Sequence, residues 1–123
     1  MKTLFQHGPI TLRTLSSDDV DALHAVRSDP EVARFQGWRP MSRDEVAAFI
    51  DSNAPWTPLT PGRWGQIAVC RADDGALIGD VGVFVSDSEE YAQFGLSLAR
   101  HVQGKGYGTH TVRAVTEWLF AET

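Results

Sequence analysis

Three closely spaced glycines, Gly104, Gly106 and Gly108, separate an apolar segment from a helical one, and they constrain the fold more than any other feature. Residues 91–98 have the composition of a strand, and a helical pattern of apolar residues begins at about Thr109. Glycine gives the backbone access to conformations that are closed to other residues. A helix that starts directly after such a turn offers unpaired N–H groups and the positive end of its dipole. This strand, turn and helix therefore predict a site for a phosphate or pyrophosphate group.

The spacing of these glycines excludes the two common nucleotide-binding loops. A dinucleotide-binding fingerprint needs G-x-G-x-x-G, a further strand and an acidic residue about 20 positions later. This chain reads G-x-G-x-G, and too few residues follow Gly108 for that strand and acid. The sequence contains no G-x-x-x-x-G-K-[ST] loop either. A different phosphate-bearing ligand is expected.

Residues 103–108, which read Gln-Gly-Lys-Gly-Tyr-Gly, resemble the Q/R-x-x-G-x-G/A signature of the GCN5-related N-acetyltransferases. In that family the loop binds the pyrophosphate of acetyl-coenzyme A (acetyl-CoA). The resemblance covers residues 10–122 and looks like the subgroup that acetylates ribosomal-protein N-termini, whose relatives modify aminoglycosides and other small amines. Further matching segments follow in the family's order, at residues 10–13, 28–32, 77–81 and 92–96.

The resemblance implies an α/β (α+β) fold, the acyl-CoA N-acyltransferase fold, in which helices flank a mostly antiparallel sheet. Residues 1–123 are expected to form a single domain that is truncated after the helix following the pyrophosphate loop. Family members continue through another strand, a helix and a closing hairpin. Without that strand the sheet presents an unpaired edge and part of an apolar helix face. The chain is therefore expected to be a fragment of a longer enzyme, or to complete itself as a homo-oligomer or by strand exchange.

The same resemblance implies where acetyl-CoA binds. The backbone of the strand before the loop would hydrogen-bond the pantetheine arm of the cofactor, and the glycine-rich loop would hold its pyrophosphate. The predicted cofactor-binding residues are Leu96, Leu98, Gln103, Gly104, Lys105, Gly106, Tyr107, Gly108 and Thr109.

Two residues are candidates for the chemistry, which requires an amine that has lost its proton. Relatives commonly read Ala-Glu-Ile-Gly where residues 92–95 read Ala-Gln-Phe-Gly, and an amide such as Gln93 cannot take a proton at neutral pH. Gln93 either orients a water or the amine, or is only an exposed strand residue. Asp80 is the other catalytic candidate, because strand alternation places it on one face of the middle strand where partial burial favours proton uptake. Its alternative role is to bind the backbone or a neighbouring arginine.

The resulting hypothesis is an N-acetyltransferase that transfers acetyl from acetyl-CoA to a primary amine by direct attack within a ternary complex. The acceptor is either a protein or peptide N-terminus or a small-molecule amine. A hypothesis from a different class is a non-catalytic module that binds coenzyme A or a protein partner, because the chain lacks the usual glutamate and the second half of the fold.

The composition of the chain limits which partners it is expected to bind and where in the cell it is expected to lie. A formal net charge of −5 and a pI near 5.2 argue against binding to nucleic acid or to an anionic membrane. The single cysteine, Cys70, excludes an intrachain disulfide and a cysteine-based metal cluster, and the four histidines show no metal-ligand spacing. No metal is therefore expected. The sequence has neither an apolar run of about 18 residues nor the pattern of a signal peptide, so a cytoplasmic location is predicted.

Local signals predict the remaining elements. Pro30 is expected to end the first helix, and the residues around His7 are expected to be disordered. Trp38, Trp56 and Trp64 either shape an acceptor pocket or pack the core. The predicted elements are a strand at 10–15, a helix from the cap at 16–19 to about residue 28, a helix from the capping box at 42–45, a hairpin of 66–71 with 76–85, and a strand at 91–98.

Overall fold

The computed structural model describes residues 2–36, 39–53 and 59–122. The strands are β1 (Thr3–His7), β2 (Ile10–Thr14), β3 (Gly65–Arg71), β4 (Leu77–Val85) and β5 (Ala92–Leu98). The helices are α1 (Val20–Arg27), α2 (Pro30–Gln36), α3 (Arg43–Asn53) and α4 (Tyr107–Glu122), with short 3-10 turns η1 (Ser17–Asp19) and η2 (Arg100–Val102).

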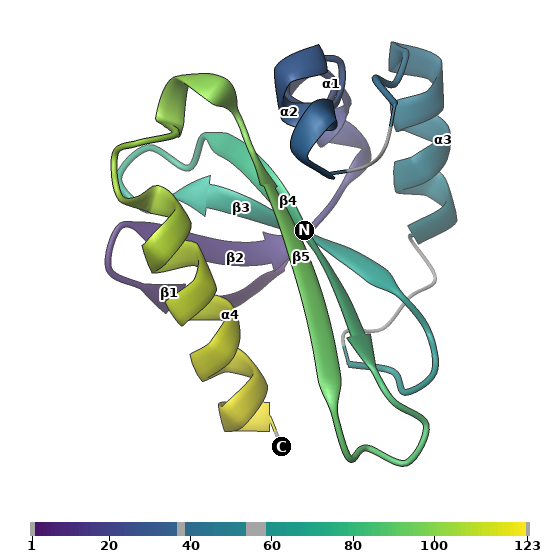
Figure 1. The fold of residues 1–123 in the computed structure, drawn as a ribbon, viewed down its shortest axis with the longest axis vertical. Coiled ribbons are helices and arrows are strands. Elements are labelled where there is room, and N and C mark those ends of the chain that lie inside the picture. Colours follow the sequence, from purple (N-terminus) through teal and green to yellow (C-terminus); the bar gives the residue numbers. More distant parts are fainter. Residues whose placement is uncertain (1, 37–38, 54–58, 123) are drawn as a thin grey trace.

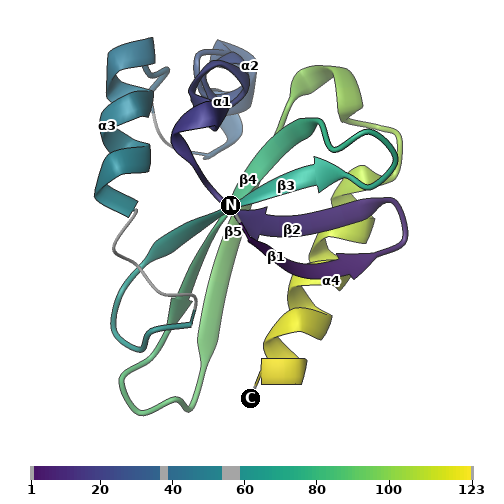
Figure 2. The same cartoon turned by 180° about the vertical axis from the view of Figure 1, so that it is seen from behind.

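The five strands form one sheet in their order along the chain, β1-β2-β3-β4-β5, and every neighbouring pair is antiparallel. Helix α4 crosses one face of this sheet over β1 and β2, while α1, α2 and α3 gather at the other side near β4 (Figure 1). The view from behind shows the same separation of α4 from the other three helices (Figure 2). The predicted antiparallel sheet flanked by helices is confirmed.

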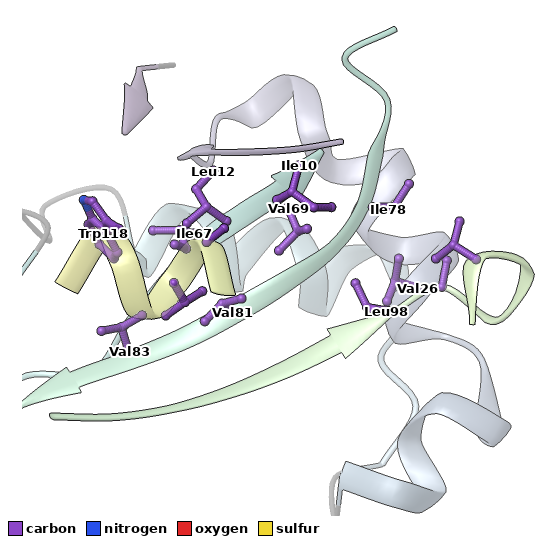
Figure 3. Packing of buried hydrophobic residues seen from close by; sticks show 14 of the residues in the cluster. Ile10, Leu12, Val26, Ile67, Val69, Ile78, Val81, Val83, Leu98 and Trp118 are labelled. Atoms are coloured by element: carbon purple, nitrogen blue, oxygen red, sulfur yellow. The ribbon is translucent and has the colours of Figure 1, made fainter. Parts of the chain in front are cut away.

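Two buried clusters hold these layers together. In the larger cluster, Val81 and Val83 of β4 lie with Trp118 of α4 and with apolar residues of β2 and β3 (Figure 3). The smaller cluster joins α1 to α3 through Leu23 and Val46, both fully buried. Because successive strand residues point to opposite faces, β4 contributes Val81 to the first layer and its neighbour Asp80 to the side that carries α1.

Two elements differ from the sequence-based prediction. The residues around His7 are not disordered: they form β1, which pairs with β2 through a tight turn at Gly8, whose φ is +54°. Pro30 does not simply end a helix but occupies the first position of α2, where its missing N–H costs nothing. The Asp29 carboxylate accepts a hydrogen bond from the Glu31 N–H at 2.9 Å and caps this new helix.

The predicted capping box at residues 42–45 and the predicted cap at residues 16–19 are both present. Ser42 Oγ accepts from the Glu45 N–H at 3.1 Å, and the Glu45 carboxylate accepts from the Ser42 N–H at 3.0 Å. At the start of η1, the Asp19 carboxylate accepts from the Ser16 N–H at 2.8 Å and also receives two hydrogen bonds from Arg13, at 2.8 and 2.9 Å. Asp19 thereby ties β2 to the beginning of α1.

Replacing Asp19 by asparagine is expected to lower the free energy of unfolding by about 2 kcal/mol at neutral pH, because the nearly buried Arg13 loses its counter-ion. Burial disfavours the ionised carboxylate, but the hydrogen bonds from Arg13 and Ser16 outweigh burial and lower the pKa of Asp19. The ionised group therefore stabilises the fold above its unfolded pKa, near pH 4, and this contribution disappears as the pH falls through the lower folded pKa. Urea unfolding between pH 7 and pH 2 measures the difference.

The exposed neighbour Asp18 provides the matched control, since Asp18→Asn should change the free energy of unfolding by less than about 0.5 kcal/mol. A difference between Asp19→Asn and the wild-type chain that stayed constant down to pH 2 would contradict the assigned role of the ion pair.

Candidate active site

The glycine-rich loop adopts the backbone that its sequence predicts. Gly104 and Gly106 have φ angles of +79° and +85°, which side-chain-bearing residues rarely adopt, and no described atom lies within 4 Å of a Cβ built on either one. Glycine is needed at both positions for backbone conformation and not for space. The loop residues 103–106 are all exposed.

Helix α4 begins directly at the end of this loop. The His110 N–H donates to the Gly106 carbonyl at 3.2 Å, so the N–H groups of Tyr107, Gly108 and Thr109 precede the helix's own hydrogen bonds. These groups and the helix dipole favour an anion at the loop. The sixteen-residue helix is long enough to develop that dipole.

Gln103 joins the loop to the neighbouring strand, because its side-chain Nε2 donates to the Leu98 carbonyl at 3.0 Å. The Tyr107 side chain turns the other way. It packs against the main core and lines a hollow of about 310 Å³ between two hairpin turns, formed with Gly8, Pro9 and Asp73. Tyr107 can therefore contribute its backbone N–H to the loop, while its ring anchors the start of α4.

Strand β5 pairs only with β4 within the described part of the chain, so no strand covers its other edge, where the Leu98 carbonyl accepts from Gln103. Two backbone hydrogen bonds set the direction of its backbone groups: Ala99 N–H donates to the Ile78 carbonyl at 2.7 Å, and Ser86 N–H donates to the Tyr91 carbonyl at 2.9 Å. In this register the odd-numbered residues of β5 bond β4, and the even-numbered ones point their N–H and C=O groups outward. Leu96 and Leu98, the strand residues predicted to bind the cofactor, are among the latter.

Lys105 gives the loop itself a positive charge, and its side chain is exposed. Arg100 is engaged elsewhere, because its guanidinium binds the Asp29 carboxylate at 2.7 and 3.0 Å. These hydrogen bonds from Arg100 lower the pKa of Asp29. Arg100 therefore brings less free charge to the loop than Lys105 does.

Asp80 lies on the other side of the sheet from α4, and its side chain is fully shielded from solvent. Arg27, at the end of α1, binds it through Nε at 3.2 Å and through Nη2 at 2.5 Å. Gln66 Nε2 donates to the same carboxylate at 2.5 Å. Both oxygens are thus engaged, which matches the alternative that Asp80 binds a neighbouring arginine. Its catalytic role stays a prediction, and in this arrangement Asp80 reaches a substrate only through Gln66 or Arg27.

Gln93, the other catalytic candidate, is exposed on β5 and shares the sheet face of Asp80. A glycine pair separates the two residues, so neither β4 nor β5 places a side chain between them. The cross-strand pairs on this face are Phe84 with Gln93, Gly82 with Gly95, and Asp80 with Ser97.

Of the three tryptophans predicted to shape a pocket or to pack the core, the structure describes only Trp64. Trp64 is 56% exposed and packs on Phe84 with ring centroids 5.4 Å apart, so it borders this face and is not a core residue. Trp38 and Trp56 lie outside the described residues. Sequence reasoning did not identify Gln66 or Arg27. The only signal for Gln66 was a polar residue leading into the apolar segment 67–70.

The free edge of β5 adjoins an apolar groove of about 340 Å³ between the end of α4 and the start of β5. Two large side chains on its rim are exposed, Tyr91 at 56% and Phe120 at 79%. This agrees with the expected open edge and helix face. Completion by a second copy or by a further segment stays a prediction.

Three further features of the described residues concern the lone cysteine, metal binding and membrane insertion. Cys70 is buried, and burial raises the pKa of its thiol. Within residues 2–36, 39–53 and 59–122, no three His, Cys, Asp or Glu side chains come together as a metal site. No helix in those same ranges has the length and apolar character required to span a bilayer.

Comparisons with known proteins agree with this geometry. A family model described as an acetyltransferase (GNAT) domain matches residues 10–123. An uncharacterized N-acetyltransferase, p20, of Bacillus licheniformis is 26% identical over 126 residues, which cover 98% of this chain and 67% of that protein.

Solved structures share the fold at low identity. A GNAT-family acetyltransferase from Bacillus anthracis has a TM-score of 0.80 at 17% identity, covering 96% of this chain and 66% of that one. A spermidine N-acetyltransferase from Vibrio cholerae, in complex with CoA and spermine, has a TM-score of 0.77 at 20% identity, covering 94% and 66%. A putative ribosomal-protein-serine acetyltransferase from Vibrio cholerae has a TM-score of 0.74 at 18% identity, covering 99% and 70%. The chain spans about two thirds of the length of these relatives.

Proposed function

Because the chain belongs to the GNAT acetyltransferase family, we propose that it binds acetyl-CoA and transfers the acetyl group to a primary amine. The observation that carries the proposal is the loop between β5 and α4. It contains two positive-φ glycines directly before a helix start, and Gln103 Nε2 donates to the Leu98 carbonyl of the neighbouring strand.

The described residues suit two parts of acetyl-CoA, its pyrophosphate and its pantetheine arm. The N–H groups at the start of α4, together with Lys105, would hold the pyrophosphate. The outward-facing amides of Leu96 and Leu98 would hydrogen-bond the pantetheine arm as a strand does. When bound, acetyl-CoA supplies a thioester whose carbonyl carbon the amine can attack. The protein's part is to bring the two together and to orient the amine.

The acceptor is proposed to approach the sheet face that carries Gln93 and the Gly82–Gly95 pair, because this face borders the same strand edge. Gln93 is exposed there and can orient the amine or a water. The names of relatives suggest two acceptor classes, a polyamine such as spermidine and a ribosomal protein. We propose a primary amine in either setting.

Thermal unfolding with acetyl-CoA tests the proposal directly. At about 100 times its dissociation constant, a ligand stabilises a fold by about 2.7 kcal/mol, which should raise the melting temperature of this chain by several degrees. Gly106→Ala should lose most of that increase, because alanine disfavours the +85° φ that orients the loop's N–H groups.

Gly75→Ala is the matched control for this experiment. Gly75 also has a positive φ, +74°, and open space around its Cβ position, but it lies in the turn between β3 and β4. Both substitutions should lower the free energy of unfolding by about 1 kcal/mol, because each one strains the backbone. Only Gly106→Ala should lose the response to acetyl-CoA. Equal responses in the two variants would contradict the assignment of the loop.

A second candidate function is a non-catalytic module, and the free edge of β5 together with the amide at Gln93 favours it. Release of coenzyme A thiol during incubation with acetyl-CoA and a panel of small amines and peptides separates the two. Acetylated product supports the enzyme, and binding of acetyl-CoA without any product supports the module. Size-exclusion chromatography of the same sample measures its oligomeric state and so tests the predicted homo-oligomer.

A further inference from the structure

Gln66 is held at both its backbone and its side chain. The Asn53 side chain, at the end of α3, donates to the Gln66 carbonyl at 2.9 Å and accepts from the Gln66 N–H at 2.8 Å. At its other end, Gln66 Nε2 donates to Asp80 at 2.5 Å. A glutamine side chain has three rotatable torsions and is ordinarily mobile, so these contacts give the Gln66 amide a defined position.

The hydrogen-bond network also decides which end of the amide faces which way. Asp80 accepts two N–H groups from Arg27, and an ionised carboxylate has no hydrogen to donate. The NH₂ end of Gln66 must therefore face Asp80, which leaves Oε1 directed away from it. A Cβ built on Gly82 would lie 2.5 Å from Oε1, so this oxygen lies directly over Gly82.

Among the described residues, nothing donates a hydrogen bond to Gln66 Oε1. The one buried side-chain N or O atom without a partner in that part of the chain is His110 Nδ1. Gln66 Oε1 is thus a solvent-accessible acceptor atom that has no partner among the described residues. It borders the glycine pair Gly82 and Gly95, and a Cβ on Gly95 would have no described atom within 4 Å.

These observations describe a small, open patch of sheet with a single oriented carbonyl oxygen beside it. Phe84 and the half-exposed Trp64 border the patch on one side, where a carbon chain or ring can pack. Gly95 belongs to β5, whose free edge carries the backbone groups proposed to bind acetyl-CoA. A ligand that donates N–H groups satisfies the oxygen, and a primary amine is such a ligand.

We propose that Gln66 Oε1 receives the amine of the acetyl acceptor over the Gly82–Gly95 pair. This proposal rests on the proposed acetyl transfer and names the residue that orients its acceptor. Asp80 and Arg27 are positioning residues: they act through the Gln66 amide, because Arg27 holds Asp80 and Asp80 holds Nε2. Arg27 is itself placed over the Phe49 ring of α3, 5.3 Å from its centroid.

A titration of the isolated chain tests this without acetyl-CoA. In ¹H–¹⁵N spectra, butylammonium should shift the Gln66 side-chain NH₂ signal and the backbone signals of Gly82 and Gly95. Tetramethylammonium carries the same charge but no N–H group, and it should leave these signals in place. Shifts that were equal for the two cations, or that mapped to another surface, would overturn the proposal.

Two variants probe the oxygen itself. Gln66→Met keeps the length of the side chain and removes the amide, and Gly82→Ala displaces Oε1 by crowding the end of a flexible side chain. Both should abolish the butylammonium response while the spectrum stays that of a folded chain. Gln6→Met, on the exposed face of β1, is the control and should respond as the wild type does. A retained response in folded Gln66→Met would overturn the proposal.

With acetyl-CoA present, Gln66→Met should raise the KM for the amine about tenfold or more, as expected when a hydrogen bond to a charged group is lost, and change the KM for acetyl-CoA by less than about twofold. Asp80→Asn should raise the amine KM as well, because the Gln66 amide can then rotate. A purely structural role for Asp80 would lower only the melting temperature. If acetyl-CoA failed to stabilise the wild-type chain, the proposed function would fail, and the donor-free titration would still decide the role of Gln66.

Discussion

Replacing Gly79 by alanine is expected to force β5 away from β4 and to lower the free energy of unfolding by about 3 kcal/mol or more. A Cβ on Gly79 would lie 2.1 Å from the Ser97 carbonyl oxygen, 2.8 Å from Leu98 Cδ2 and 3.1 Å from Leu98 Cα. Two of these atoms belong to the backbone, which cannot rotate away as the end of a side chain can. The strain therefore falls on the pairing between the strands.

Gly79→Ala is also expected to abolish binding of acetyl-CoA. Leu98 and Leu96 present the outward backbone groups proposed to bind acetyl-CoA, and Gln103 bonds the Leu98 carbonyl. Moving β5 therefore disturbs both the strand edge and the loop. Urea unfolding measures the loss of stability, and the rise in melting temperature with acetyl-CoA, which should vanish in Gly79→Ala, measures the loss of the site.

Gly95→Ala, on the partner strand, is the control for stability. No described atom lies within 4 Å of a Cβ on Gly95, and its φ is not positive. Alanine there should leave the unfolding midpoint unchanged or raise it slightly, because it reduces the freedom of the unfolded chain. Similar midpoints for Gly79→Ala and Gly95→Ala would contradict the close approach of β4 to β5.

Trp118→Ala is expected to destabilise the chain by about 3 to 5 kcal/mol, because it removes the largest fully buried side chain of the core. Trp118 is 2% exposed and holds α4 to the sheet, packing in one cluster with Leu12, Ile67 and Val83 (Figure 3). Small domains are stable by about 5 to 15 kcal/mol, so this loss leaves a marginal fold. Chemical unfolding followed by circular dichroism measures it.

Phe120 lies two positions further along the same helix and offers a matched control. It is 79% exposed, so Phe120→Ala should change the free energy of unfolding of the isolated chain by less than about 0.5 kcal/mol. A loss in Phe120→Ala as large as that in Trp118→Ala would show that α4 packs on the sheet through a different face.

Local signals predicted most of the elements because their causes are local. The capping box at Ser42 and Glu45 and the glycines at 104 and 106 depend on residues close together in the chain, and all of them act as expected. The prediction failed where a distant partner decides the outcome. The segment around His7 becomes β1 because β2 is available to pair with it, and no periodicity within seven residues could reveal that partner.

In the candidate site, too, some features depend on local sequence and others depend on distant residues. The sequence by itself determined the backbone of the loop at residues 103–108, since positive φ angles and a helix start follow from glycine chemistry and spacing. Only the tertiary structure decided what surrounds Asp80. Arg27 and Gln66 lie far from it in sequence, and a buried carboxylate takes whichever donors the packing of α1 against β3 and β4 brings within reach. The same packing turned an ordinary glutamine, Gln66, into an oriented carbonyl oxygen beside two facing glycines.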